Sequence, residues 1–345
     1  MNELLVLAVA NKWLLTVSLA LGGLGAWIIS RCANNIGLID KPNERSSHSN
    51  PTPKGGGVGI LMAFVVAGFK LDFPLTFLLA ATGLSLVSLI GDKIHLSPLL
   101  RLVVQFVAAF IALHSLNYTE LVTMFNKQNN ATILALLTIM AIVFIVGTAN
   151  FYNFMDGING IAGLTGIISF LFLALYGLYN GFPNSWILLS LIVCISCIGF
   201  LPFNFPRARV FMGDVGSVLL GFLFASIVIA TAKSFEEFIL LSSFMFPFYA
   251  DEFVTISERI RDGWSLARPH RRHLYQVLAN EAKIPHWKVS IGYALFQVFT
   301  IIIFWKTFKY GFLAFILTLV ITFILFIFLN NFIKKSYQIA FQNVN

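Results

Sequence analysis

The chain has 345 residues, of which 58% are hydrophobic and only 11% are charged. Soluble domains carry about 25% charged residues, so this composition excludes an ordinary water-soluble protein and indicates that a bilayer is the main solvent. The net charge of +8 could indicate a nucleic-acid partner, but the basic residues are distributed as in a membrane protein, and we expect no nucleic acid.

Apolar segments follow one another along nearly the whole chain, and about 20 such residues cross the hydrocarbon core of a bilayer. Backbone groups in lipid must be hydrogen-bonded internally, so each crossing is expected to be a helix. We therefore predict a single all-α domain, residues 1–345, that forms a polytopic bundle of about 11 transmembrane spans. The expected spans are 4–29, 55–70, 74–91, 98–116, 131–149, 158–179, 185–203, 216–232, 237–250, 289–305 and 311–330.

The basic residues predict how this bundle lies in the membrane. With the N-terminus outside, 17 of the 23 Lys and Arg residues fall on one face. Because cytoplasmic loops are enriched in Lys and Arg, that face is expected to be cytoplasmic, and the C-terminus lies there too. The same face receives the segments rich in Gly, Asn, Asp and His, which we predict to be the active-site loops: 31–54, 92–97, 150–157, 204–215 and 251–288.

These five inner loops carry the residue types that bind ligands. In chain order their sequences include Asp40-Lys-Pro-Asn-Glu-Arg-Ser-Ser-His48, Gly91-Asp92-Lys-Ile-His-Leu-Ser-Pro-Leu-Leu-Arg101, Asn150-Phe-Tyr-Asn153-Phe-Met-Asp156-Gly-Ile-Asn159, Phe211-Met-Gly-Asp214-Val-Gly-Ser217 and His270-Arg271-Arg-His273-Leu-Tyr-Gln276.

Three carboxylates stand out because each lies at or near the inner end of a span. An Asp at the centre of a membrane helix costs about 2.5–3.5 kcal/mol to insert, whereas Asp92, Asp156 and Asp214 can reach water or a cavity. Carboxylates beside glycines suit Mg²⁺, a hard ion that keeps waters and shares substrate phosphates. Each Asp alone could equally cap a helix or form a turn; the three together on one face favour a site.

Four polar residues, Asn150, Asn153, Asp156 and Asn159, repeat every three positions. Successive members are neighbours on a helix, but the series drifts by about 180° over nine residues. Either a ligand wraps the helix or the helix breaks near Gly157. The alternative is that these side chains bond adjacent helices.

Together, the five loops resemble the polyprenyl-phosphate N-acetylhexosamine-1-phosphate transferases, from about residue 31 to 280 and in the same order. Residues 51–53, 153–156 and 270–276 look most like the initiating transferases of O-antigen type. The resemblance implies transfer of a sugar-1-phosphate from a UDP-linked N-acetylated sugar to a polyprenyl phosphate, such as undecaprenyl phosphate, with release of UMP. It also implies a multi-pass protein of the bacterial inner membrane whose active site faces the cytoplasm; a homodimer is left open.

The resemblance also implies roles for individual residues. Asp92, Asp156 and Asp214 would be catalytic, with Asp214 and Asp156 binding Mg²⁺ or Mn²⁺. Phe211 would stack on uracil, and Asn150 and Asn153 match active-site positions. The further residues expected to bind substrate are His48, Arg101, Asn159, His270, Arg271 and His273.

Charge neutralisation is the physical demand of this reaction, because both substrates carry phosphates. At 4 Å and an effective dielectric of 20, each pair of like unit charges costs about 4 kcal/mol. The metal, Arg101, His48 and the pair His270 and His273 are the expected counter-charges. Arg271 and Arg272 could instead be solvated charges of the cytoplasmic face.

The chain departs from the family pattern at Gly91, where relatives carry a second Asp before Asp92. The missing carboxylate is dispensable, or Asp92 replaces it, or catalysis is impaired and the chain is a scaffold. Asn159 also stands where relatives often have Asp. The rival class is a transporter or flippase, but transporter sites lie near the bilayer midplane and often accompany internal repeats, and the sequence shows neither.

Overall fold

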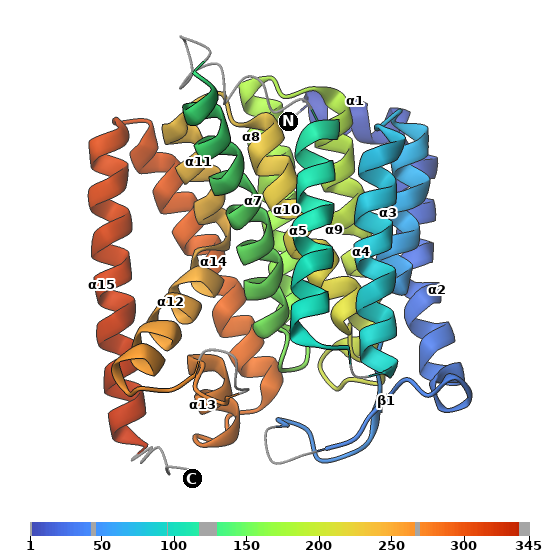
Figure 1. The fold of residues 1–345 in the computed structure, drawn as a ribbon, viewed down its shortest axis with the longest axis vertical. Helices are drawn as coiled ribbons and strands as arrows, with labels where there is room; N and C mark the ends of the chain where they lie inside the picture. Colours follow the sequence, from blue (N-terminus) through green and yellow to red (C-terminus); the bar gives the residue numbers. More distant parts are fainter. Residues whose placement is uncertain (1, 43–45, 95, 117–129, 266–269, 338–345) are drawn as a thin grey trace.

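The computed structural model describes residues 2–42, 46–94, 96–116, 130–265 and 270–337, which form a bundle of roughly parallel and antiparallel helices (Figure 1). The helices are α1 (Asn2–Ala10), α2 (Lys12–Ile36), α3 (Val58–Lys70), α4 (Leu75–Lys93), α5 (Pro98–Ser115), α7 (Ala131–Phe154), α8 (Ile161–Asn180), α9 (Asn184–Asn204), α10 (Asp214–Thr231), α11 (Phe235–Ser242), α12 (Phe246–Arg261), α13 (Leu274–Asn280), α14 (His286–Phe308) and α15 (Phe312–Ser336).

The prediction of a polytopic helical membrane protein is confirmed. Within the described ranges, ten helical stretches are long and apolar enough to cross a membrane, with α11 and α12 counted as one stretch, Phe235–Arg261. The second predicted span, 55–70, corresponds to α3, which has only 13 residues and is not among these ten. At 1.5 Å per residue α3 extends about 20 Å, less than the roughly 30 Å hydrocarbon core.

Two predicted spans differ most from the helices of the structure. The first, 4–29, is divided at Asn11, so the crossing helix begins at Lys12 and continues to Ile36. The ninth, 237–250, extends in the structure from Phe235 to Arg261. The charged residues beyond position 250 obscured this extension, because hydropathy alone ends the span where the first carboxylates appear.

A short hairpin was not predicted from the sequence. Strands β1 (Ile39–Asp40) and β2 (Thr52–Pro53) pair antiparallel, with Asp40 opposite Thr52. The segment that includes β2 and the residues after it lies beside Phe211. The Phe211 N–H donates to the Pro53 carbonyl at 2.8 Å, and the Gly56 N–H donates to the Phe211 carbonyl at 2.9 Å. The hairpin therefore joins two loops that are more than 150 residues apart in the sequence.

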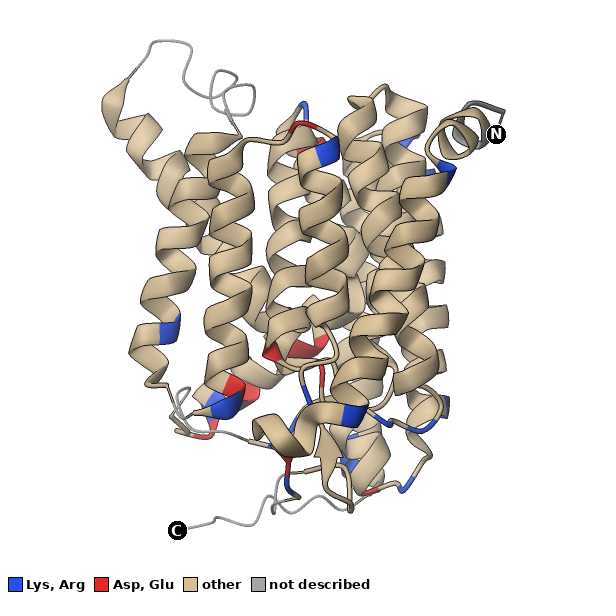
Figure 2. Cartoon of the chain, turned by 90° about the vertical axis from the view of Figure 1, so that its right-hand side faces the viewer, with Lys and Arg blue, Asp and Glu red and all other residues tan. Residues whose placement is uncertain are grey.

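Helix α10 lies at the centre of the bundle and is almost entirely buried, whereas α15 is mostly exposed on its outer side (Figure 1). The start of α10 meets the start of α3 where glycine is required: a Cβ on Gly57 would lie 2.4 Å from the Gly216 Cα. Most of the coloured acidic and basic residues gather toward one end of the bundle (Figure 2). At this end α10 begins and α4 and α7 end.

Candidate active site

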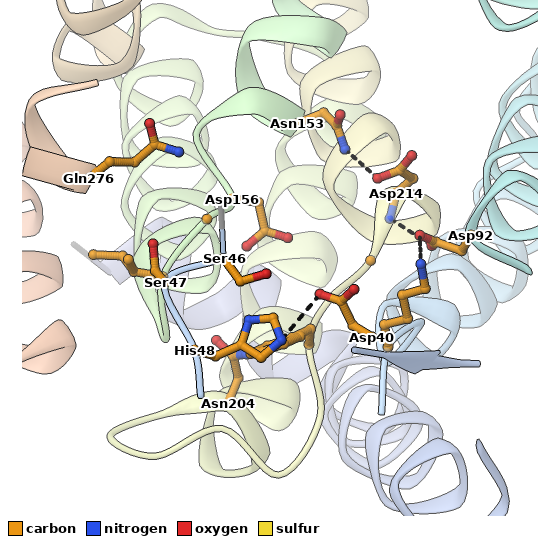
Figure 3. Close-up of a pocket in the computed structure, with 15 residues that line it drawn as sticks. Asp40, Ser46, Ser47, His48, Asp92, Asn153, Asp156, Asn204, Asp214 and Gln276 are labelled. Carbon is orange, nitrogen blue, oxygen red and sulfur yellow. Dashed lines mark hydrogen bonds and ion pairs between the residues drawn. The ribbon is translucent and has the colours of Figure 1, made fainter. Parts of the chain in front are cut away.

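A cavity of about 310 Å³ opens at the charged end of the bundle. Six separate stretches of the chain contribute to it: the β1–β2 hairpin with its loop and Lys54, the end of α4, the end of α7 with the turn after it, the end of α9, the start of α10 with the residues just before it, and α13. Its lining residues are Asp40, Ser46, Ser47, His48, Lys54, Asp92, Asn153, Asp156, Gly157, Ile158, Asn204, Phe211, Gly213, Asp214 and Gln276 (Figure 3).

Asp214 is the first residue of α10. The residue before it, Gly213, is the N-cap and has φ +74°, outside the helical region. An acidic residue in the first helical turn is favoured by the helix dipole. Both carboxylate oxygens are engaged: Oδ1 accepts from Asn153 Nδ2 at 2.8 Å, and Oδ2 accepts from Arg101 Nη1 at 2.8 Å. Helices α5 and α7 thus both hold the Asp214 side chain.

Asp92, in the last turn of α4, links this helix to α10. Its Oδ2 accepts the backbone N–H of Asp214 at 2.9 Å, which satisfies one of the free N–H groups at a helix N-terminus. Its Oδ1 lies 3.4 Å from the Lys54 ammonium. Asp92 therefore caps the N-terminus of α10 and also lines the cavity. A capping function was the alternative given above for each Asp alone.

Asp156 differs from the other carboxylates that line the cavity in its contacts with described residues. It follows α7 in a turn closed by the Asp156 N–H bond to the Asn153 carbonyl at 3.1 Å, and its side chain points into the cavity (Figure 3). Within the described parts of the chain its carboxylate has no hydrogen-bond or ion-pair partner. Burial, and then the nearby Asp214 and Asp92 carboxylates, raise the pKa of Asp156 well above its ordinary value.

The loop after β1 closes the opposite wall of the cavity. The His48 ring meets the Phe211 ring edge to face, with centroids 4.9 Å apart, and His48 Nε2 lies 3.6 Å from Asp40 Oδ2. Phe211 is held at this wall by its backbone bonds to Pro53 and Gly56. The aromatic residue expected to face uracil thus lines the same cavity as the three carboxylates.

The structure therefore brings together six of the predicted site residues around one cavity: His48, Asp92, Asn153, Asp156, Phe211 and Asp214. Arg101 lies directly behind them, bonded to Asp214 and to the Gly91 carbonyl.

Two predicted asparagines lie away from the cavity lining. Asn150 exchanges hydrogen bonds with Gln105, at 2.6 and 3.2 Å, across the contact between α7 and α5. Asn159 donates weakly to the Pro206 carbonyl at 3.4 Å, and its own carbonyl accepts from Ser290. Both side chains therefore bond neighbouring segments, which is the alternative given above for this polar series. The helix also ends near Gly157, as one reading of the series required, because α7 stops at Phe154.

The predicted basic cluster at 270–273 also lies outside the cavity lining. The His273 ring is buried between Asp251 and Glu252, with nitrogen–oxygen distances of 3.7 and 3.6 Å, and His273 is the N-cap of α13. Burial lowers the pKa of His270 to about 3, so at neutral pH His270 supplies no counter-charge. Arg271 pairs with Glu281 at 2.6 Å. What α13 itself contributes to the cavity is Gln276.

Several lining residues were not predicted as site residues, although they lie in the predicted loops: Asp40, Lys54, Asn204 and Gln276. Asn204 has a supporting function: it accepts from the Gly160 N–H at 2.7 Å and donates to the Val210 carbonyl at 2.9 Å. In the sequence Lys54 is marked by the three glycines that follow it. Its charge alone could not distinguish it from the other lysines expected on the cytoplasmic face.

The donor set fits a magnesium ion that is shared with a substrate. Among the described residues no group of three or more His, Cys, Asp or Glu side chains forms a site that protein alone could complete. Mg²⁺, however, is commonly held by one or two carboxylates together with substrate phosphates and waters. The unpaired Asp156 carboxylate, with Asp214 near it, provides such a partial set.

Comparisons with known proteins point to one class of enzyme. Residues 74–232 match the model of glycosyl transferase family 4. A decaprenyl-phosphate N-acetylglucosaminephosphotransferase of Mycobacterium leprae is 30% identical over 334 residues, covering 83% of this chain and 81% of that protein. An undecaprenyl-phosphate alpha-N-acetylglucosaminyl 1-phosphate transferase of Thermotoga maritima is 28% identical over 76% of this chain and 80% of its own. A probable undecaprenyl-phosphate N-acetylglucosaminyl 1-phosphate transferase of Bacillus subtilis is 26% identical, with 79% and 78% covered.

Proposed function

The chain belongs to glycosyl transferase family 4, the superfamily of polyprenyl-phosphate N-acetylhexosamine-1-phosphate transferases, and from this premise we propose that it moves an N-acetylhexosamine-1-phosphate from a UDP-sugar to undecaprenyl phosphate and releases UMP. Names of the relatives specify a polyprenyl-phosphate acceptor and an N-acetylglucosamine phosphate. The proposed setting is the cytoplasmic face of a bacterial inner membrane, at the first membrane step of O-antigen or another envelope polysaccharide.

One observation supports this proposal most strongly: Asp92, Asp156 and Asp214 come from three distant segments and line a single cavity, in which Asp156 is unpaired. The cavity lies at the charged end of the bundle and not at its middle. A transporter site would be expected near the bilayer midplane, so the position of the cavity favours an enzyme that acts at the membrane surface.

In the proposed reaction an oxygen of the lipid phosphate forms a bond to the β-phosphorus of the UDP-sugar. The bond from that phosphorus to the oxygen shared with the α-phosphorus breaks, and UMP leaves with this oxygen. Phosphoryl transfers of this kind depend mainly on positioning and on stabilisation of charge. The protein therefore needs fixed contacts more than it needs a strong base.

The side chains of the cavity can supply those contacts. Asp156 and Asp214 would hold Mg²⁺ or Mn²⁺, which when bound neutralises diphosphate charge. Arg101 and Asn153 keep the Asp214 carboxylate in a fixed orientation. Phe211 offers a ring face or edge to the uracil base at the wall that it shares with His48.

Assay of the purified full chain tests this function. UMP release is measured with undecaprenyl phosphate, Mg²⁺ and a panel of UDP-linked N-acetylated sugars, first among them UDP-N-acetylglucosamine. We expect release that requires both substrates, that is abolished by excess chelator, and that returns with Mg²⁺ or Mn²⁺. No turnover with any donor of the panel would contradict the proposed reaction, and full turnover in chelator would contradict the metal.

A further inference from the structure

Lys54 lines the cavity, and backbone hydrogen bonds to Leu38 and to Phe211 hold the segment that contains it. Its N–H donates to the Leu38 carbonyl at 2.9 Å, and the residues flanking it bond to Phe211. The segment that carries Lys54 is therefore fixed between the first loop and the start of α10. These backbone bonds fix the point from which the Lys54 side chain extends into the cavity.

The ammonium group of Lys54 has more donors than the protein uses. An ammonium carries three N–H donors, and the partner that the described residues give it is Asp92 Oδ1, at 3.4 Å. The Lys54 side chain is 22% exposed and lines the cavity. Donor capacity thus remains for an acceptor that enters from the cavity.

The carboxylates around the cavity would repel a phosphate, so a phosphate that binds there needs a cation beside it. Four carboxylates line it, those of Asp40, Asp92, Asp156 and Asp214, while Lys54 supplies the one Lys or Arg side chain among the described lining residues. Arg101 is already committed, because its Nη1 and Nη2 donate to Asp214 and to the Gly91 carbonyl. A phosphate that enters this acidic space would be repelled unless a cation faced it.

We propose that Lys54 binds a substrate phosphate, with Asp92 orienting its ammonium group toward the cavity. This inference rests on the proposed function, since that function brings phosphates into the cavity. The shared chemistry is a phosphate oxygen that accepts from an ammonium; its source is either the diphosphate of the nucleotide or the phosphate of the lipid. In the contrasting explanation Lys54 only neutralises Asp92 and stabilises the fold.

The test compares three variants of the purified full chain with the wild type. Lys54→Met keeps the length of the stem without the charge, and Lys54→Arg keeps the charge. Lys93→Met is the matched control, because Lys93 is exposed beside Asp92 and does not line the cavity. Affinities for UDP and for uridine are measured by calorimetry, which needs no turnover, and KM for undecaprenyl phosphate is measured where turnover occurs.

A lost charge-assisted bond should weaken phosphate binding by about tenfold or more. If the nucleotide is the source, Lys54→Met loses the preference for UDP over uridine; if the lipid is the source, its KM for undecaprenyl phosphate rises instead. Lys54→Arg should retain most of the wild-type value, and Lys93→Met should match the wild type. Unchanged UDP preference together with unchanged lipid KM in Lys54→Met would overturn the proposal.

Two further results keep this inference separate from the proposed function. If the wild type turns over substrate and Lys54→Met has the wild-type UDP preference and lipid KM, the result contradicts only the role assigned to Lys54 and not the proposed reaction. Wild-type protein that lacks turnover, but whose preference for UDP depends on Lys54, would contradict the reaction and retain the phosphate contact. If Lys54→Met does not purify as a folded protein, Lys54→Gln takes its place in both measurements.

Discussion

The three carboxylates predicted to be catalytic differ in what the protein already bonds to them. Asp214 accepts from Asn153 and Arg101, and Asp92 accepts from the Asp214 N–H and lies near Lys54. Asp156 keeps its lone pairs for a ligand. Of the two predicted metal ligands, Asp156 is therefore the one whose carboxylate has no hydrogen bond or ion pair to give up among the residues that the structure describes.

At Gly91, the residue that departs from the family pattern, the structure shows what a side chain would meet. A Cβ there would lie 3.0 Å from Arg101 Nη2, the flexible end of a side chain, and Arg101 Nε is buried without a partner. We expect Gly91→Asp to fold and to keep turnover within about tenfold of wild type, since its carboxylate can pair with Arg101.

Gly91→Asn is the control, because it has the same shape without the charge. We expect Gly91→Asn to be less stable than Gly91→Asp by about 1 kcal/mol, since it crowds the guanidinium group and cannot form an ion pair with it. Thermal unfolding of both purified variants measures this difference. Equal stability of the two would show that Arg101 does not interact with a carboxylate at position 91.

Among the elements, α13 is short but joins three parts of the site. Seven residues do not form a stable helix alone, and the buried Asp251 accepts from the Leu274 N–H at 2.9 Å, at the start of α13. Tyr275 then donates to the Phe154 carbonyl at 2.9 Å, next to Asp156. Asn280 donates to Ser47 in the loop that carries His48.

Tyr275→Phe should therefore act on the turn that positions Asp156. We expect turnover to fall by about tenfold, equivalent to roughly 1.4 kcal/mol in the barrier, with a modest loss of stability. Tyr176→Phe is the matched control, because the Tyr176 hydroxyl donates to Glu237 on α11 at 2.9 Å and does not contact this turn. Equal turnover in the two variants would contradict a positioning function of Tyr275.

His273 gives the same element a pH dependence. Burial lowers the pKa of His273, but the carboxylates of Glu252 and Asp251 outweigh burial, and the net pKa is raised above 6.5. Lys334 on α15 opposes them in part, and His270 packs against the ring. A raised folded-state pKa stabilises the fold fully below 6.5, and this stability is lost as pH rises through the raised value.

Melting temperatures of wild type and His273→Gln test this linkage between about pH 6 and 9. We expect the wild type to lose stability relative to His273→Gln as the pH rises, because only the wild type releases a proton there. A difference between the two proteins that is constant across this range would show that His273 is not protonated in the folded state.

The elements also show how far sequence patterns could predict this molecule. Hydropathy predicted the helices, because a bilayer allows few alternatives to a helix, and the motifs predicted the meeting of Asp92, Asp156 and Asp214. The patterns could not predict the β1–β2 hairpin or the α13 contacts. These depend on single hydrogen bonds between distant segments, such as Phe211 to Pro53, which leave no periodic signal.

For the whole molecule, the asymmetric distribution of charge is the feature that predicts orientation. The cavity lies at the end where acidic and basic residues gather (Figure 2), and cytoplasmic loops are enriched in Lys and Arg. The end with the cavity is therefore expected to face the cytoplasm, where a UDP-sugar is available.

Single-cysteine labelling of intact cells tests this orientation. Cys32 is exposed and is replaced by Ser, whereas Cys194 and Cys197 are buried. We expect an impermeant thiol reagent to label Asn184→Cys, at the end of the bundle away from the cavity, and not Arg261→Cys, at the end with the cavity. Labelling of position 261 but not of position 184 would reverse the orientation.

The most direct test of the account is UMP release by Asp156→Asn, measured beside the wild type. The substitution keeps the shape of the side chain but replaces the carboxylate that would bind the metal with a neutral amide. Asp72→Asn, at an exposed position outside the cavity, is the control and should retain wild-type turnover. We predict that Asp156→Asn purifies normally and loses nearly all turnover; retention of more than about a tenth, a barrier change under roughly 1.4 kcal/mol, would contradict the assignment of this cavity as the catalytic site.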